Sequence, residues 1–242
     1  MADYYLIVSN PPHRDVQHDH AIIAECLGIS QAEAGMRVRF PAPEIWQVDL
    51  DHDLAKQKAE TMYTAGVNCA VVSGSVLGAV PTPHHVVSFS ISPTGFTAKI
   101  DSGEIDLPWE SHIVAVMSNP LPVDERMQRG TDSGAARNVT LHLFFRIDKG
   151  WHAVVIDTAH VDFRGLGEFK MPTAIGNVHS ILEEFQKTFR SAIVDERMMG
   201  VEYHYMVING IVLPKLLVDI SDDFERLDPF ELGSILTFLT AK

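Results

Sequence analysis

The chain has 242 residues, of which 46% are apolar and 21% charged, and this composition excludes a disordered chain. With 19 Lys and Arg against 32 Asp and Glu, the net charge is −13, which argues against a nucleic-acid or anionic-membrane surface because such surfaces are basic. The length fits two modest domains or one large one. With two cysteines and no secretory leader pattern, we expect a soluble cytoplasmic protein without membrane insertion.

Residues 1–80 alternate short apolar runs with helical patterns, which predicts a small α/β domain in the order β-α-α-β-α-β. The Ser30 and Glu33 pair has the spacing of a capping box at the start of the second helix, and Asp51 or Asp53 caps the third helix. The expected elements are a strand at 4–9, helices at 16–27 and 31–38, a strand at 44–50, a helix up to Gly66, and a closing strand at 67–72.

The motifs YYLIVSN, LGISQAEA and PEIWQVDLDHDLAKQKAETMYTAGVNCAVV resemble the small α/β fold shared by the ribosomal stalk protein's C-terminal domain and the ClpS-type adaptor of the Clp protease. Both families bind other proteins, so the resemblance implies protein binding. The adaptor holds a free N-terminal amine with an Asn and acidic residues after its first strand; Asn10 matches that Asn, but Pro11 and Pro12 follow it. The stalk domain uses a lysine-rich helix face, whereas Arg37 and Arg39 are two of only five basic residues here.

From residue 81 onward, short strands alternate with turns, which predicts a β-rich domain over 81–242 and an α+β fold for the chain. The pattern predicts antiparallel strands packed by helices at about 175–198, opened by Thr173 or Asn177, and at about 228–240. The segment IDLPWESHIVAV resembles the middle of bacterial pleckstrin-homology-like domains. Asn209-Gly210 is typical of a tight hairpin turn.

Twelve histidines raise the question of a metal site, but their spacings do not favour a shared metal. Gly165-Leu166-Gly167 is too short for a dinucleotide fingerprint, and Cys69 lies in an apolar strand. The sequence therefore predicts no catalytic residue, no cofactor and no metal ligand. The alternative is a metal-dependent enzyme that uses strand histidines and nearby carboxylates: His142, His152, His160, His204, Asp157 and Asp162.

The interpretation favoured by the sequence is a non-catalytic protein-interaction module, an adaptor or assembly factor that binds a protein partner and no nucleic acid. Its expected partner-binding residues are Asn10, Arg37, Arg39, Asn209 and Gly210. A homo-oligomer is a further possibility, since the apolar run GIVLPKLLV could pair with another copy, although Pro214 and Lys215 weaken that strand edge.

Overall fold

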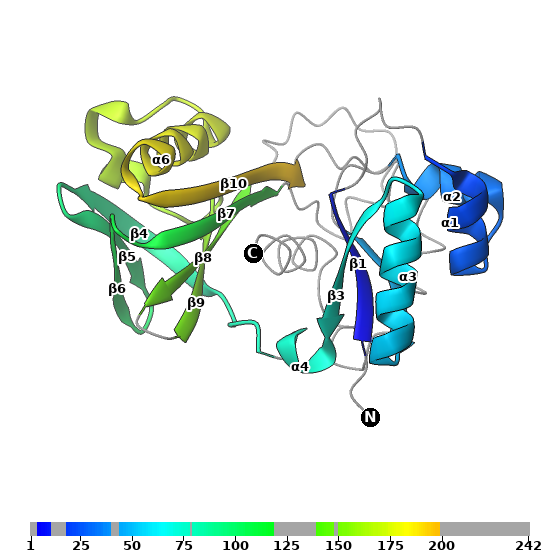
Figure 1. The fold of residues 1–242 in the computed structure, drawn as a ribbon. Helices are drawn as coiled ribbons and strands as arrows, with labels where there is room; N and C mark the ends of the chain where they lie inside the picture. Colours follow the sequence, from blue (N-terminus) through cyan, green and yellow to red (C-terminus); the bar gives the residue numbers. More distant parts are fainter. Residues whose placement is uncertain are drawn as a thin grey trace. The chain divides into compact units, whose positions relative to one another are not determined.

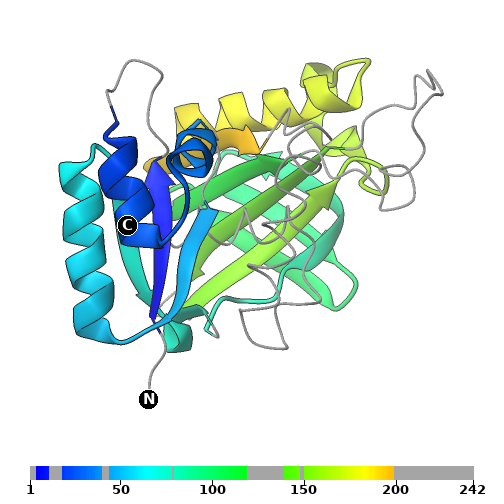
Figure 2. The same ribbon diagram turned by 90° about the vertical axis from the view of Figure 1, so that its right-hand side faces the viewer.

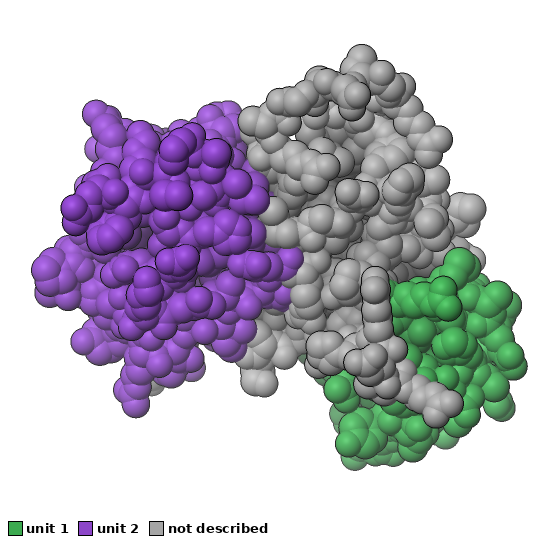
Figure 3. All heavy atoms as spheres, turned by 90° about the horizontal axis from the view of Figure 1, so that it is seen from above, with its two compact units in different colours: residues 1–80, 202–242 green, residues 81–201 purple. Residues whose placement is uncertain are grey.

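The computed structural model describes residues 4–10, 18–39, 44–77, 79–118, 139–147 and 150–198. The chain forms two compact units with a boundary between Val80 and Pro81, shown in separate colours in Figure 3. The expected Asn209-Gly210 hairpin, His204 and the expected helix at 228–240 lie outside the described residues. Each unit is described by itself below, unit 1 through its described residues between 4 and 80, and unit 2 through its described residues between 81 and 198.

Unit 1 is a three-stranded antiparallel sheet in the order β2-β1-β3, and its helices α1, α2 and α3 lie on one side of this sheet (Figures 1 and 2). The element order confirms the predicted β-α-α-β-α-β sequence. The bounds are β1 (Tyr4–Asn10), α1 (His20–Leu27), α2 (Gln31–Arg37), β2 (Glu44–Leu50), α3 (His52–Thr64), β3 (Asn68–Ser73) and the short α4 (Gly74–Leu77).

Side-chain caps set where the helices of unit 1 begin. The Ser30 hydroxyl accepts from the Glu33 amide at 3.1 Å, and the Asp51 carboxylate accepts from the Leu54 amide at 2.9 Å, as the sequence predicts. Helix α1 begins later than the sequence predicts. The Asp19 carboxylate accepts from two first-turn amides, so the helix begins at His20 and not near residue 16. These helices and the sheet bury one apolar core that includes Leu6, Val8, Ile23, Ala34, Trp46, Ala55, Met62 and Val67.

Unit 2 is a seven-stranded mixed sheet in the order β10-β7-β8-β9-β4-β5-β6. The chain is thus α+β, as predicted. Most neighbouring strands of this sheet pair antiparallel, as expected, but β10 runs parallel to β7 and β4 runs parallel to β9. Both parallel pairs join strands that are far apart in the sequence. The bounds are β4 (His84–Ser92), β5 (Gly95–Ile100), β6 (Gly103–Pro108), β7 (His112–Ser118), β8 (Thr140–Ile147), β9 (Gly150–Asp157), a 3-10 helix η1 (Phe163–Phe169), α6 (Ala174–Thr188) and β10 (Ser191–Met198).

The predicted helix at 175–198 is correct at its start and wrong at its end. The Thr173 hydroxyl accepts from the Gly176 amide at 3.1 Å and caps α6, as expected. The helix stops at Thr188 because Phe189 takes an extended conformation and packs its buried ring against Trp109, with ring centroids 4.7 Å apart. The following residues 191–198 pair with β7 as a strand.

Helix α6 lies on one face of the unit 2 sheet (Figures 1 and 2) and supplies much of its core. Phe185 is fully buried and meets Phe96 edge to face at 5.1 Å between ring centroids. The other buried residues of this helix are Asn177, Val178, Ile181 and Leu182. No helix within the described ranges is both long and apolar enough to cross a membrane.

Candidate partner-binding groove

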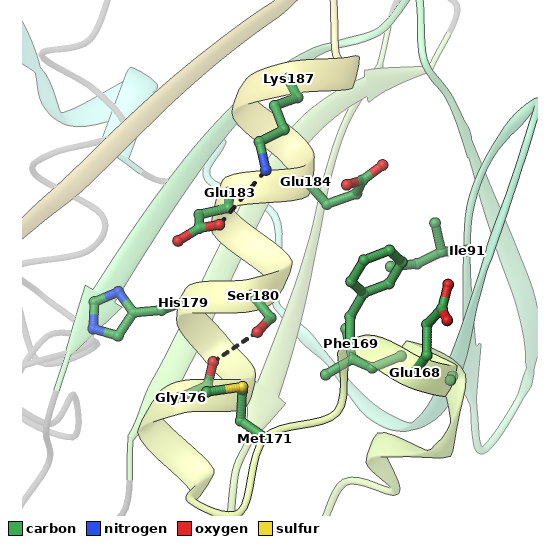
Figure 4. A pocket seen from close by; sticks show the side chains of 13 residues that line it. Ile91, Glu168, Phe169, Met171, Gly176, His179, Ser180, Glu183, Glu184 and Lys187 are labelled. Atoms are coloured by element: carbon green, nitrogen blue, oxygen red, sulfur yellow. Dashed lines mark hydrogen bonds and ion pairs between the residues drawn. The ribbon is translucent and has the colours of Figure 1, made fainter.

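A groove of about 870 Å³ lies in unit 2 between α6 and the residues around η1, next to the end of β4 (Figure 4). One wall is α6, from Gly176 in its first turn to Lys187 in its last. The other wall is the η1 segment (residues 163–172), with Ile91 of β4 beside it. Apolar and charged side chains both line this groove.

The η1 segment is fixed to the rest of unit 2 at both of its ends. At the start, the amide of Asp162 donates to the carbonyl of Val87 at 2.9 Å. At the end, the amide of Met171 donates to the side-chain oxygen of Asn177 at 2.7 Å, and Asn177 is only 4% exposed. Because the Asn177 side chain is buried, its hydrogen bond holds the Met171 backbone in one position. This wall of the groove therefore has a defined geometry.

Glycines allow the η1 segment to approach its neighbours closely. A Cβ on Gly165 would overlap the carbonyl oxygen of Phe89 in β4. A Cβ on Gly176 would lie 3.0 Å from the Cβ of Met171. Gly167 has φ +56, a left-handed conformation that favours glycine. The Gly165-Leu166-Gly167 run therefore has a structural role, in which Leu166 is buried and the two glycines shape the segment around it.

Large apolar side chains stay exposed on this fixed segment. Phe169 is 64% exposed and Met171 is 49% exposed, and both line the groove. Ile175, in the first turn of α6, is 42% exposed. Exposed apolar side chains held close together are typical of interaction surfaces.

The charges of the groove are mostly negative. Glu183 pairs with Lys187 at 3.6 Å, four residues further along α6. Glu184 accepts a hydrogen bond from the Thr188 hydroxyl at 3.1 Å. Glu168 makes no hydrogen bond or ion pair with any described residue. Three carboxylates and one ammonium group therefore line the groove, together with His179, whose Nδ1 lies 3.7 Å from Glu196 of β10.

The residues that the sequence predicts for partner binding lie in unit 1 where they are described. Asn10 ends β1 opposite Asn68 of β3, and Arg39 is exposed just after α2. Arg37 is only 9% exposed and its Nη2 lies 3.2 Å from Glu33 Oε1, so its guanidinium faces a neighbour in its own helix. Asn209 and Gly210 lie outside the described residues.

The strand histidines of the metal alternative point in different directions. His142 of β8 is buried on one face of the sheet, whereas His152 of β9 lies on the other face and stacks on Phe145. His160 is exposed and its Nδ1 lies 2.7 Å from Asp157 Oδ2. Within the described ranges, no three His, Cys, Asp or Glu residues are placed to hold a metal ion together.

The remaining candidate groups are accounted for by local contacts. Asp162 accepts from the backbone and side chain of Arg164, which hold the pKa of its carboxyl below the usual range. Burial, with a smaller contribution from Cys26, raises the pKa of the Cys69 thiol to about 12. Burial also raises the pKa of Cys26. A raised pKa favours the protonated thiol of both cysteines at neutral pH.

Comparisons of the chain with protein families, with characterised proteins and with solved structures give no match. The groove was not predicted from the sequence. The available signal was the run EFKMP just before the Thr173 cap, because two large apolar residues there fall outside any strand or helix period. A large apolar residue that follows neither the strand nor the helix period is not expected in the core, so it indicates an exposed apolar surface.

Proposed function

We propose that this protein is a non-catalytic protein-interaction module, and that the groove between α6 and the η1 segment binds a segment of its partner. The observation that carries the proposal is the exposure of Phe169 and Met171 on a backbone that hydrogen bonds hold in place. A fixed apolar surface binds with less loss of conformational freedom than a mobile one, so its burial contributes more fully to affinity. Aromatic side chains are also frequent energetic centres of protein interfaces.

An adaptor role for the whole chain has separate support from unit 1. The motifs of residues 4–72 resemble two families that bind proteins, and Asn10 stands at the end of β1 as the adaptor family's Asn does. Unit 1 would then offer a second binding surface in addition to the groove of unit 2. The free thiols of Cys26 and Cys69 favour a reducing compartment, and we place the protein in the cytoplasm.

The test has two steps. First, a photoreactive phenylalanine analogue at position 169 of the full chain identifies the partner in the native host by cross-linking and mass spectrometry.

Second, the Phe169→Ala variant tests whether the purified partner binds in the groove. We expect Phe169→Ala to raise the Kd of the purified partner at least about tenfold, since removal of a central aromatic residue typically costs more than about 1.4 kcal/mol of binding free energy. Its stability should change by less than about 0.5 kcal/mol because the ring is mostly exposed.

Tyr63→Ala is the matched control, because Tyr63 is a similarly exposed aromatic residue on α3 of unit 1. Its Kd should equal that of the wild type. A partner that binds Phe169→Ala and the wild type with the same Kd would contradict the proposal for this groove. If the Tyr63→Ala variant alone lost binding, the partner surface would lie on unit 1 instead.

A further inference from the structure

We infer that the groove takes a short extended segment of a partner protein that carries a Lys or Arg next to a bulky apolar residue. This inference rests on the proposed function and specifies the chemistry of the partner. Three features of the groove lead to it: the position of the Phe169 ring, the uneven distribution of charge across the groove, and its length.

The Phe169 ring provides the apolar contact. It projects from the η1 segment between α6 and Ile91 and stands open to solvent (Figure 4). Ile91 is packed against the core of unit 2, so this side of the groove has an apolar wall that does not move with the ring. A bulky side chain placed against Phe169 and Ile91 loses apolar surface to both.

The charges point to a cation beside that apolar contact. Glu168 and Glu184 lie on the same side of α6 as the Phe169 ring, whereas Glu183 and His179 lie on the other side (Figure 4). Lys187 pairs with Glu183 and compensates its charge. The two carboxylates near Phe169 have no such cation among the described residues that line the groove.

Lys170 is the basic residue closest in the sequence to Glu168, as Lys187 is to Glu184. Lys170 is not part of the groove lining, and its charge acts on Asp162 at the other end of the η1 segment. An ammonium or guanidinium group on this side of α6 would therefore be attracted by two carboxylates that no cation of the groove lining compensates. The Phe169 ring lies on the same side of α6, and the face of an aromatic ring also attracts cations.

The length of the groove suits a short extended segment. Its wall on α6 runs from Gly176 to Lys187, which is roughly 16 Å at 1.5 Å per residue. An extended chain rises about 3.3 Å per residue, so about five residues of a partner fit along it. A segment of about five residues is long enough to place an apolar side chain against Phe169 and a neighbouring basic side chain near the carboxylates.

The test is a selection of random seven-residue peptides, displayed on phage, against the immobilised full chain. We expect the enriched peptides to carry Lys or Arg within two positions of a Phe, Leu, Met or Trp. The double variant Glu168→Gln and Glu184→Gln should bind the best synthetic peptide at least about fivefold more weakly and should lose the preference for Lys and Arg. Glu110→Gln, which removes an exposed carboxylate elsewhere in unit 2, is the control and should bind as the wild type does.

The outcomes separate the inference from the proposed function. Peptides that depend on Phe169 but show no preference for basic residues, or that prefer acidic ones, overturn the inference and leave the protein-binding groove in place. The absence of any enriched peptide that depends on Phe169 overturns both. A dimer of the wild type that dissociates in Phe169→Ala, measured by analytical ultracentrifugation, also overturns the inference, because the occupant is then a second copy of the chain.

Discussion

Phe185→Ala is expected to destabilise unit 2 by about 3–5 kcal/mol, the range for truncation of a fully buried phenylalanine. Phe185 is fully buried and makes edge-to-face contacts with Phe96 and Phe189, each at 5.1 Å between ring centroids. Its removal leaves a cavity between α6 and the sheet. Urea unfolding of the full chain, followed by tryptophan fluorescence, measures the loss. Two of the three tryptophans, Trp109 and Trp151, belong to unit 2 and report on it.

Ile175→Ala is the control on the same helix. Ile175 is partly exposed at the first turn, and we expect its truncation to change the free energy of unfolding by no more than about 0.5 kcal/mol. Equal unfolding curves for Phe185→Ala and the wild type would mean that α6 does not pack on the sheet through this face. The wall of the groove would then be misplaced as well.

Gly165→Ala is expected to destabilise unit 2 by about 2–3 kcal/mol, because the added methyl group has no space. Its Cβ would overlap the carbonyl oxygen of Phe89 and lie 2.8 Å from the carbonyl carbon. The η1 segment would have to move away from β4, and Phe169 would move with it. We therefore expect Gly165→Ala to weaken binding of the partner as strongly as Phe169→Ala does, although residue 165 carries no charged or aromatic group.

Gly150→Ala is the matched control for this substitution. The nearest described side-chain atom to its Cβ, Nε2 of His152, would lie at 3.5 Å, which is ordinary van der Waals contact. Urea unfolding and partner titration of both variants check the prediction. Wild-type stability in Gly165→Ala would show that the close approach of the η1 segment to β4 does not exist in solution.

Local features of the sequence predicted much of the secondary structure. The caps at Ser30, Asp51 and Thr173 could be recognised because a cap depends on residues within one turn of the helix. The element order of unit 1 follows from the same kind of short-range pattern. The strand at 44–50 could be found from an apolar run bounded by turn residues.

Long-range contacts explain what the sequence did not predict. The end of α6 depends on Phe189 packing against Trp109, which lies 80 positions earlier in the chain. Parallel pairing of β10 with β7 likewise depends on a partner far away in the sequence. The groove combines both effects, because Phe169 lines it only when Asn177 fixes Met171 and when Gly165 reaches β4.

The central claim, that the partner binds along α6 and the η1 segment, is tested most directly by amide hydrogen exchange. The measurement compares the full chain alone with the full chain saturated by its captured partner, read by mass spectrometry of peptides. We predict slower exchange in residues 163–188 when the partner is bound, with the largest change around Phe169 and Met171. Unchanged exchange in residues 163–188, together with protection of α3 or β3 in unit 1, would contradict the account.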